Sequence, residues 1–357
     1  MGAALHRLRA QGPVTSAVPV LRPSTSEAEP PLVGLAEIRA AATRLRGIAI
    51  RSPLLPFGTT RGGAPILLKA ESLQSVGAFK IRGAYNAISL LSAEDRARGV
   101  VSHSSGNHAQ GVARAARLLG VHAVIVMPSD APAIKRGRVE ADGAEIVTVG
   151  PASGDREAMA NRLVEERGLV LVPPYDDDRV IAGQGTVGVE IVEDVPDLAA
   201  VLVPIGGGGL ASGIASAVKL LRPEVRVIGV EPDLAADAAE SLSTGRIVRW
   251  DAARTGRTIA DGTRSQAIGR RPFEHLSRRL DAVVTVTEAE IAAAIRLAAE
   301  EARLVVEPSG ALAPAAARFR AGDAGLDGVT GTVVAIVSGG NVDPVRYREL
   351  LGWPLPD

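Results

Sequence analysis

Short apolar runs alternate with alanine-rich stretches of helical periodicity along the chain from residue 64 onward. The runs are rich in β-branched residues and apolar throughout, which is typical of strands buried on both faces of a parallel sheet. They predict strands at 65–69, 99–103, 122–127, 144–149, 169–172, 199–204, 225–230, 282–286 and 332–337. The intervening stretches predict helices near 78–91, 107–119, 132–141, 154–167, 180–194, 209–222, 287–303, 309–320 and 342–351. This alternation indicates an α/β fold.

Two segments depart from the pattern. Residues 1–32 contain five prolines and show neither the helical nor the strand pattern of apolar residues. They predict a disordered extension. The early arginines of this segment also resemble those of a transit peptide. The uncharged run 198–218 is long enough to span a membrane. Pro204 and the glycines at 206–209 would break a helix there, so the run predicts a strand, a loop and a helix, and no membrane segment.

Composition narrows the function classes. A length of 357 residues suggests about two domains. The chain has 40 basic and 40 acidic side chains, so it lacks the excess positive charge that drives nucleic-acid binding. It contains no cysteine, which excludes disulfides, thiolate metal sites and a cysteine nucleophile, and favours a cytoplasmic location.

Lys80 is unusual because the chain has only four lysines, at 69, 80, 135 and 219, and otherwise uses arginine for positive charge. It lies between Phe79 and Ile81, with no carboxylate within four residues. An apolar setting without an ion-pair partner lowers the pKa of an ammonium group, as Schiff-base formation requires. The alternative is a lysine that extends its charge from a helix start into solvent.

Four consecutive glycines, 206–209, join the predicted strand 199–204 to the helix that follows. Such a run lets backbone N–H groups converge, and the helix N-terminus adds positive potential, so a phosphate fits there. The run matches neither the Walker pattern nor the dinucleotide fingerprint. The alternative to a phosphate site is a flexible loop.

Polar turns follow two other predicted strands. Residues 102–111 read Ser-His-Ser-Ser-Gly-Asn-His-Ala-Gln-Gly, and their hydroxyl, amide and helix-start N–H groups suit a carboxylate, although one of them can equally be an ordinary helix cap. The last strand ends in Ser338-Gly339-Gly340-Asn341. Ligands of open α/β sheets bind at the carboxyl ends of strands. A Schiff-base lysine and a phosphate cradle in one pocket predict pyridoxal phosphate (PLP).

Four motifs together resemble the serine/threonine dehydratase and serine racemase family of fold-type-II PLP enzymes. They are Ser-Val-Gly-Ala-Phe-Lys-Ile-Arg-Gly-Ala at 75–84, Ser-Ser-Gly-Asn-His-Ala-Gln-Gly at 104–111, Pro-Ile-Gly-Gly-Gly-Gly-Leu at 204–210 and Val-Ser-Gly-Gly-Asn at 337–341. The resemblance implies two parallel-sheet α/β domains with the cofactor between them. It implies a large cofactor-binding domain at 33–96 and 176–357, a small mobile domain at 97–175, and a homodimer. Sixteen residues follow Asn341, so no C-terminal regulatory domain is expected.

The resemblance also implies roles for individual residues. Lys80 would form the Schiff base with PLP and, once displaced by the substrate amine, would remove the α-proton. The residues that would contact the cofactor beside it are Phe79, Asn107, Gly206, Gly207, Gly208, Gly209, Leu210, Glu307 and Ser338. Ser104, Asn107 and His108 would hold the substrate carboxylate through helix-start donors. A neutral serine such as Ser338 at the pyridine nitrogen makes the ring a mild electron sink, which suits elimination of a β-hydroxyl group.

The implied reaction converts L-threonine or L-serine to a 2-oxo acid and ammonia by α,β-elimination. Ser105 matches the second acid/base of serine racemases, and racemisation needs that second proton donor whereas dehydration does not. The same serine also suits a plain helix cap. Arg156 matches an arginine that approaches dicarboxylate ligands, which leaves a 3-hydroxyaspartate dehydratase open. A further hypothesis is a protein that binds the cofactor or an amino acid without catalysis.

A cation site is implied at residues 231–237, where Glu231 and Asp237 would supply carboxylates and Ala235 its carbonyl oxygen. Ligands that are all oxygen suit magnesium, or calcium or manganese, rather than zinc. The alternative is a pair of acidic residues that only stabilise a helix start.

Overall fold

The larger of two sheets has the strand order β1-β10-β9-β8-β11-β3-β2 in the computed structural model, which describes residues 17–22, 31–104, 106–131, 133–150 and 153–354. Its central strands run parallel, and β1 and β2 pair antiparallel at the two edges. The strands are β1 (Val18–Pro19), β2 (Leu54–Thr59), β3 (Pro65–Ala70), β8 (Leu198–Pro204), β9 (Arg226–Pro232), β10 (Ala282–Val286) and β11 (Thr332–Val337).

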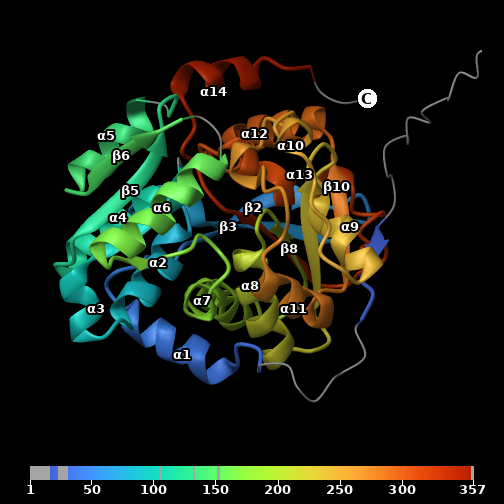
Figure 1. Cartoon of the computed structure of the whole chain (residues 1–357). Coiled ribbons are helices and arrows are strands. Elements are labelled where there is room, and N and C mark those ends of the chain that lie inside the picture. The colour runs from blue at the N-terminus through green and yellow to red at the C-terminus, as the bar shows by residue number, and fades with distance from the viewer. Residues whose placement is uncertain (1–16, 23–30, 105, 132, 151–152, 355–357) are drawn as a thin grey trace, which may run out of the picture.

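The second sheet has the order β6-β5-β4-β7 and is parallel throughout. Its strands are β4 (Val100–His103), β5 (Ala123–Pro128), β6 (Glu145–Val149) and β7 (Val170–Leu171), and the helices between them are α4 (Asn107–Leu119), α5 (Ala133–Ala141) and α6 (Ser153–Arg167). Figure 1 shows these elements grouped at the left of the molecule, in teal and green, beside the larger sheet.

The remaining helices are α1 (Leu35–Arg44), α2 (Lys80–Ser89), α3 (Ala93–Arg98), α7 (Asp178–Asp194), α8 (Gly209–Leu221), α9 (Asp237–Thr244), α10 (Ala252–Thr255), α11 (Arg270–Arg279), α12 (Glu288–Glu301), α13 (Leu312–Phe319) and α14 (Pro344–Leu351), with the 3-10 helices η1 (Glu71–Leu73), η2 (Asp261–Thr263) and η3 (Pro308–Ala311). Most of them pack against the larger sheet or between the two sheets, whereas α3 lies on the side of the smaller sheet (Figure 1). None of the helices within the described part of the chain has the length and apolarity needed to cross a membrane.

Both faces of the larger sheet are buried, which explains why its strands are apolar at every position. In β11, Val333 packs in a core cluster with residues of α12 and α13, whereas the next residue, Val334, packs in a second cluster with residues of α8. The smaller sheet is covered on one face by α2 and α4 and on the other by α6. Helix α2 therefore packs its apolar face against the smaller sheet, although in the sequence it follows β3 of the larger sheet.

Each strand that the sequence predicts is present, with its ends displaced by at most two residues. The edge strands β1 and β2 are additions to that set. Residues 17–22 depart from the prediction of disorder for 1–32, because Val18 and Pro19 pair with β10 and the Leu21 N–H donates to the Leu242 carbonyl at 2.9 Å. Most of the other residues of that segment lie outside the described ranges.

Candidate active site

A cavity of about 810 Å³ lies where the carboxyl ends of strands from both sheets meet. Its lining contains residues at or just after the ends of β4, β5, β8 and β11. Of the residues singled out from the sequence, it brings together Phe79, Lys80, Ser104, Asn107, His108, Arg156, Gly206, Gly207, Gly208, Gly209, Leu210, Glu307 and Ser338. Ser105 lies outside the described residues, and the proposed cation ligands of 231–237 do not line this cavity.

Lys80 is the first residue of α2 and projects into the cavity. Its Nζ donates a hydrogen bond to the Pro174 carbonyl at 2.8 Å and lies 5.1 Å from the centre of the Phe79 ring. Burial disfavours the charged ammonium and lowers the pKa of Lys80 to about 8. An amine with this pKa is neutral in a large fraction of molecules near pH 8, so it can act as a nucleophile or a base.

The glycine loop faces the cavity from the end of β8. Gly208, at the N-cap of α8, has a φ of 94°, a left-handed conformation that favours glycine. A Cβ atom on Gly207 would overlap the Tyr175 ring, and one on Gly206 would lie 3.1 Å from the Thr263 Cα. The loop therefore has no room for side chains, and its N–H groups adjoin the positive end of α8. This arrangement fits a phosphate group.

Asn107 and Glu307 meet across the cavity wall. The Asn107 Nδ2 donates to the Glu307 Oε1 at 2.5 Å. Burial, followed by the negative charge of Asp261, raises the pKa of Glu307 to about 7. Nearby, the Ser338 hydroxyl is buried and donates to the Ser309 carbonyl over 3.4 Å, a long contact that leaves it able to turn toward another partner. These groups form a polar wall that carries little fixed charge.

The His108 side chain is buried and neutral. Burial, with the positive charge of Lys80, lowers the pKa of this imidazole to about 3. Its Nε2 lies 3.0 Å from the Val172 carbonyl, which only accepts, so Nε2 carries the proton and Nδ1 holds a lone pair. A substrate carboxylate beside His108 would therefore be held by the N–H groups at the start of α4 rather than by the imidazole.

Several cavity residues were not predicted from the sequence as site residues. Lys135 of α5 pairs with Asp261 of η2 at 2.8 Å. This pair links the cavity wall beside the smaller sheet to the wall beside the larger sheet. Tyr175, Arg249 and Arg264 also line it. The scarcity of lysine could have pointed to Lys135. The others follow no local pattern, because their contribution depends on how distant loops pack.

The proposed cation loop lies after β9. Both carboxyl oxygens of Glu231 accept backbone N–H groups of α9, from Ala238 at 3.1 Å and from Ala239 at 2.7 Å. Asp237 is buried, and its two carboxyl oxygens make no hydrogen bond of ordinary geometry within the described residues, although the backbone N–H groups of Asp237 and Ile268 lie near enough to favour its charged form. Burial raises the pKa of both carboxyl groups, that of Asp237 to about 7. The buried Asp237 carboxyl group, which lacks a good hydrogen-bond partner, fits a hard cation, whereas the Glu231 oxygens already accept N–H groups.

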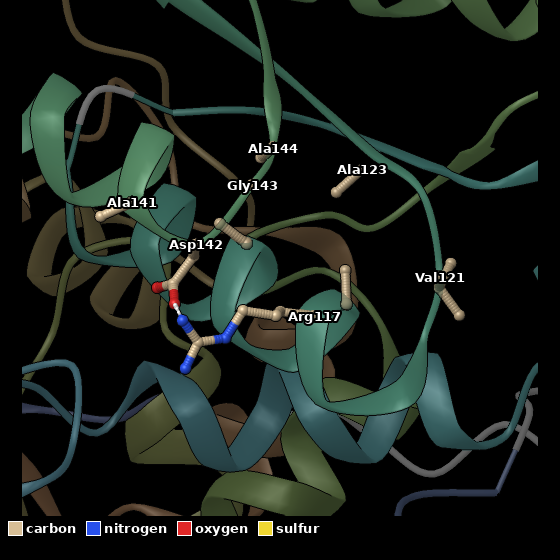
Figure 2. Close-up of a pocket in the computed structure, with 9 residues that line it drawn as sticks. Arg117, Val121, Ala123, Ala141, Asp142, Gly143 and Ala144 are labelled. Carbon is tan, nitrogen blue, oxygen red and sulfur yellow. Dashed lines mark ion pairs between the residues drawn. The ribbon is translucent and has the colours of Figure 1, made fainter.

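A second, smaller hollow of about 300 Å³ lies beside the C-terminal half of α4 (Figure 2). Its polar residues are Arg117 and Asp142, and the Arg117 Nη1 lies 3.1 Å from the Asp142 Oδ1. Arg114 also pairs with Asp142, at 2.7 Å. These ion pairs satisfy the buried carboxylate, and none of the residues singled out from the sequence lines this hollow. The larger cavity is therefore the candidate active site.

A family model of pyridoxal-phosphate dependent enzymes matches residues 46–339. The chain belongs to this PLP-dependent family. It is 42% identical over 318 residues to an L-threo-3-hydroxyaspartate ammonia-lyase of Saccharomyces cerevisiae, covering 88% of this chain and 95% of the relative. It is 44% identical over 315 residues to an L-threonine ammonia-lyase of Thermotoga maritima, covering 87% of this chain and 76% of that relative. The structure of maize serine racemase aligns with a TM-score of 0.83 at 37% identity, over 89% and 97% of the two chains.

These comparisons confirm the family and the fold class that the sequence predicts, and they support PLP as the cofactor. The cavity also fits PLP on its own chemistry. It combines an amine of lowered pKa with a glycine cradle at a helix N-terminus, and its volume is in the range of about 300–1,000 Å³ that is usual for cofactor sites.

Proposed function

We propose that the chain is a PLP-dependent ammonia-lyase that converts a small β-hydroxy amino acid, L-threonine or L-serine, to a 2-oxo acid and ammonia. One observation carries this proposal. The Lys80 amine, with its pKa near 8, shares a single cavity with the glycine cradle of 206–209. The similarity to ammonia-lyases over most of the chain agrees with it.

The residues of the cavity supply binding and proton transfer. Bound PLP would act as an electron sink for the electron pair that remains on the substrate α-carbon when the α-proton is removed. Phe79, Gly206–Gly209, Leu210 and Ser338 would hold the cofactor. The N–H groups at the start of α4, around Ser104 and Asn107, would bind the substrate carboxylate. The neutral Lys80 amine would take the α-proton, and hydroxide would leave the β-carbon; the unsaturated amine that is released reacts with water to give the 2-oxo acid and ammonia.

The test is release of 2-oxo acid and ammonia by the purified protein with PLP and magnesium. The substrates are L-serine, D-serine, L-threonine and L-threo-3-hydroxyaspartate. We expect rapid release from L-threonine or L-serine. No release from any of them by a chain that visibly binds PLP would overturn the proposal.

A second candidate substrate is 3-hydroxyaspartate, favoured by Arg156 of α6. This guanidinium lines the cavity, and burial lowers its pKa, so a second substrate carboxylate nearby would stabilise its charge. We expect Arg156→Ala to lower kcat/KM for L-threo-3-hydroxyaspartate about 10- to 100-fold while changing that for L-serine much less. Arg162, exposed on the same helix and outside the cavity lining, provides the control variant Arg162→Ala. Equal losses on both substrates would contradict this role.

Racemisation is the other candidate reaction, and it is favoured by the similarity to maize serine racemase. It would use Ser105 as the second proton donor beside Lys80. Chiral analysis of serine incubated with Ser105→Ala separates the two reactions. Loss of racemisation with elimination retained would support this second role.

We also propose that Glu231, Asp237 and the Ala235 carbonyl hold magnesium, with calcium or manganese as alternatives. A cation there would neutralise buried carboxylates and stabilise the fold. We expect saturating Mg²⁺ to raise the melting temperature, since a ligand at 100 times its Kd adds about 2.7 kcal/mol. Asp237→Asn should abolish this rise, whereas Asp233→Asn, on the same loop, should retain it. A rise unaffected by Asp237→Asn would rule out the site.

Three further features belong to this proposal. Residues 97–175 would move as a small domain over the cavity, with 33–96 and 176–357 as the large domain; the Lys135–Asp261 pair would join them when closed. The chain would form a homodimer, to which the exposed apolar side chains of Ile50 and Leu73 would contribute; the Ile50 N–H donates to the side chain of Gln74, the residue after Leu73. The absence of cysteine suits a cytoplasmic location.

A further inference from the structure

The side chain of Asn341, just after β11, bonds to three separate segments around the cavity. Its Nδ2 donates to the Val76 carbonyl and to the Asn107 Oδ1, both at 2.8 Å. Its Oδ1 accepts a hydrogen bond from the guanidinium of Arg138 on α5. Asn341 thus joins the turn before Lys80, the start of α4 and a helix of the smaller sheet.

The chemistry of these partners fixes the orientation of two amides. The Val76 carbonyl can only accept and the Arg138 guanidinium can only donate, so the Asn341 amide fits in one orientation alone. Its Nδ2 then requires an acceptor at Asn107, which must present Oδ1. The Asn107 Nδ2 is consequently turned the other way, to donate to the Glu307 Oε1 at 2.5 Å on the cavity side.

Backbone pairing holds Asn341 in this place. Ala78 and Gly339 form an antiparallel bridge, and the Gly340 N–H donates to the Gly77 carbonyl at 2.9 Å. Gly77 has a φ of 70°, and a Cβ atom there would overlap the Asn341 amide. The turn that leads to Lys80 is therefore shaped to accommodate this side chain.

We propose that Asn341 is a positioning residue that fixes the Asn107 amide with Nδ2 toward the cavity, and so sets the hydrogen bond that Asn107 offers to the cofactor. The proposal rests on the cofactor site proposed above. Asn341 is not among the described residues that line the cavity, whereas Asn107 and Glu307 are. The most direct side-chain route from Asn341 to the cavity is therefore through the Asn107 amide.

The principal test is Asn341→Asp, with PLP itself as the probe. A carboxylate can still pair with Arg138 but cannot donate to Val76 or Asn107, so the Asn107 amide loses the bond that fixes its orientation. We expect the dissociation constant of PLP to rise about 10- to 100-fold and the visible absorption of the bound cofactor to shift. An unchanged dissociation constant and spectrum would overturn the proposal.

Asn86 provides a matched control for a purely structural effect. It is buried in α2, its Oδ1 accepts from the Arg44 Nε at 2.7 Å, and its Nδ2 donates to the Arg179 carbonyl at 2.6 Å. It has the same types of partner as Asn341 but does not line the cavity. Asn86→Asp should lower the melting temperature and leave the spectrum of bound PLP unchanged. A spectral shift equal to that of Asn341→Asp would contradict a specific role.

A double-mutant cycle tests whether Asn341 acts through Asn107. We expect PLP to bind Asn107→Ala and the double variant Asn107→Ala/Asn341→Ala equally, because the second change has nothing left to orient. Additive losses would overturn the proposal. The unsubstituted chain distinguishes the two levels of failure. If it does not bind PLP, the proposed function fails; if it binds and the Asn341 variants match it, only this inference fails.

Discussion

Replacement of Lys80 by alanine is expected to reduce release of 2-oxo acid and ammonia by at least about 10³-fold. Lys80 would have two roles, as the group that holds PLP and as the base that removes the α-proton. A positioned general base alone contributes about 10²- to 10⁴-fold. The amine is suited to both roles because burial lowers its pKa to about 8. Product assays at saturating PLP and substrate measure the loss.

Two variants make this result specific. Lys80→Arg keeps the positive charge but has no neutral amine near pH 8, so it should be as inactive as Lys80→Ala. Lys219 lies away from the cavity, where its Nζ pairs with the Asp281 Oδ2 at 2.7 Å, so Lys219→Ala should keep most of the activity. Activity above a tenth of the original in Lys80→Ala would contradict the mechanism.

A buried ion-pair network fixes the first turn of α2, and with it Lys80. The Arg82 guanidinium pairs with the Glu71 Oε2 at 2.8 Å and with the Glu190 Oε1 of α7 at 2.6 Å. Lys69 of β3 pairs with the Glu190 Oε2 at 2.7 Å. Lys69, Glu71 and Arg82 are at most 1% exposed. Two cations thus balance two carboxylates inside the protein.

Arg82→Met is expected to lower the free energy of unfolding by about 3–5 kcal/mol, because it leaves two carboxylates with one cation in a buried site. The matched control is Arg51→Met. Arg51 also pairs with two carboxylates, Glu193 and Asp194, but its side chain is 50% exposed, so its loss should cost about 0–1 kcal/mol. Denaturant titration of both variants without PLP provides the comparison. Equal effects would show that burial does not determine the strength of the Arg82 pairs.

The sequence predicts most strands of this fold because burial on both faces makes them continuously apolar. It does not predict β2, whose Pro56 and Gly58 read as a turn; an edge strand tolerates them because one side of its backbone is unpaired. It also does not predict α11, where four arginines and Pro272 hide a buried stripe that includes His275 and Leu276. Tertiary contacts override local pattern at both places.

The candidate site divides in the same way. Lys80, the glycine loop and Asn107 lie in motifs that follow single strands, so local sequence reveals them. The Lys135–Asp261 pair and the Asn341–Asn107 bond join residues more than 100 positions apart. Such contacts depend on how the two sheets are placed relative to each other, which no local pattern encodes.

The most direct test of the central claim is to locate the lysine that binds PLP. Borohydride reduction of the PLP-loaded protein would attach the pyridoxyl group permanently, and mass spectrometry of its peptides would identify the modified residue. The chain offers four lysines, Lys69, Lys80, Lys135 and Lys219. We expect modification of Lys80 and its loss in Lys80→Ala. Stoichiometric modification of another lysine, or of none in a chain that binds PLP, would contradict it.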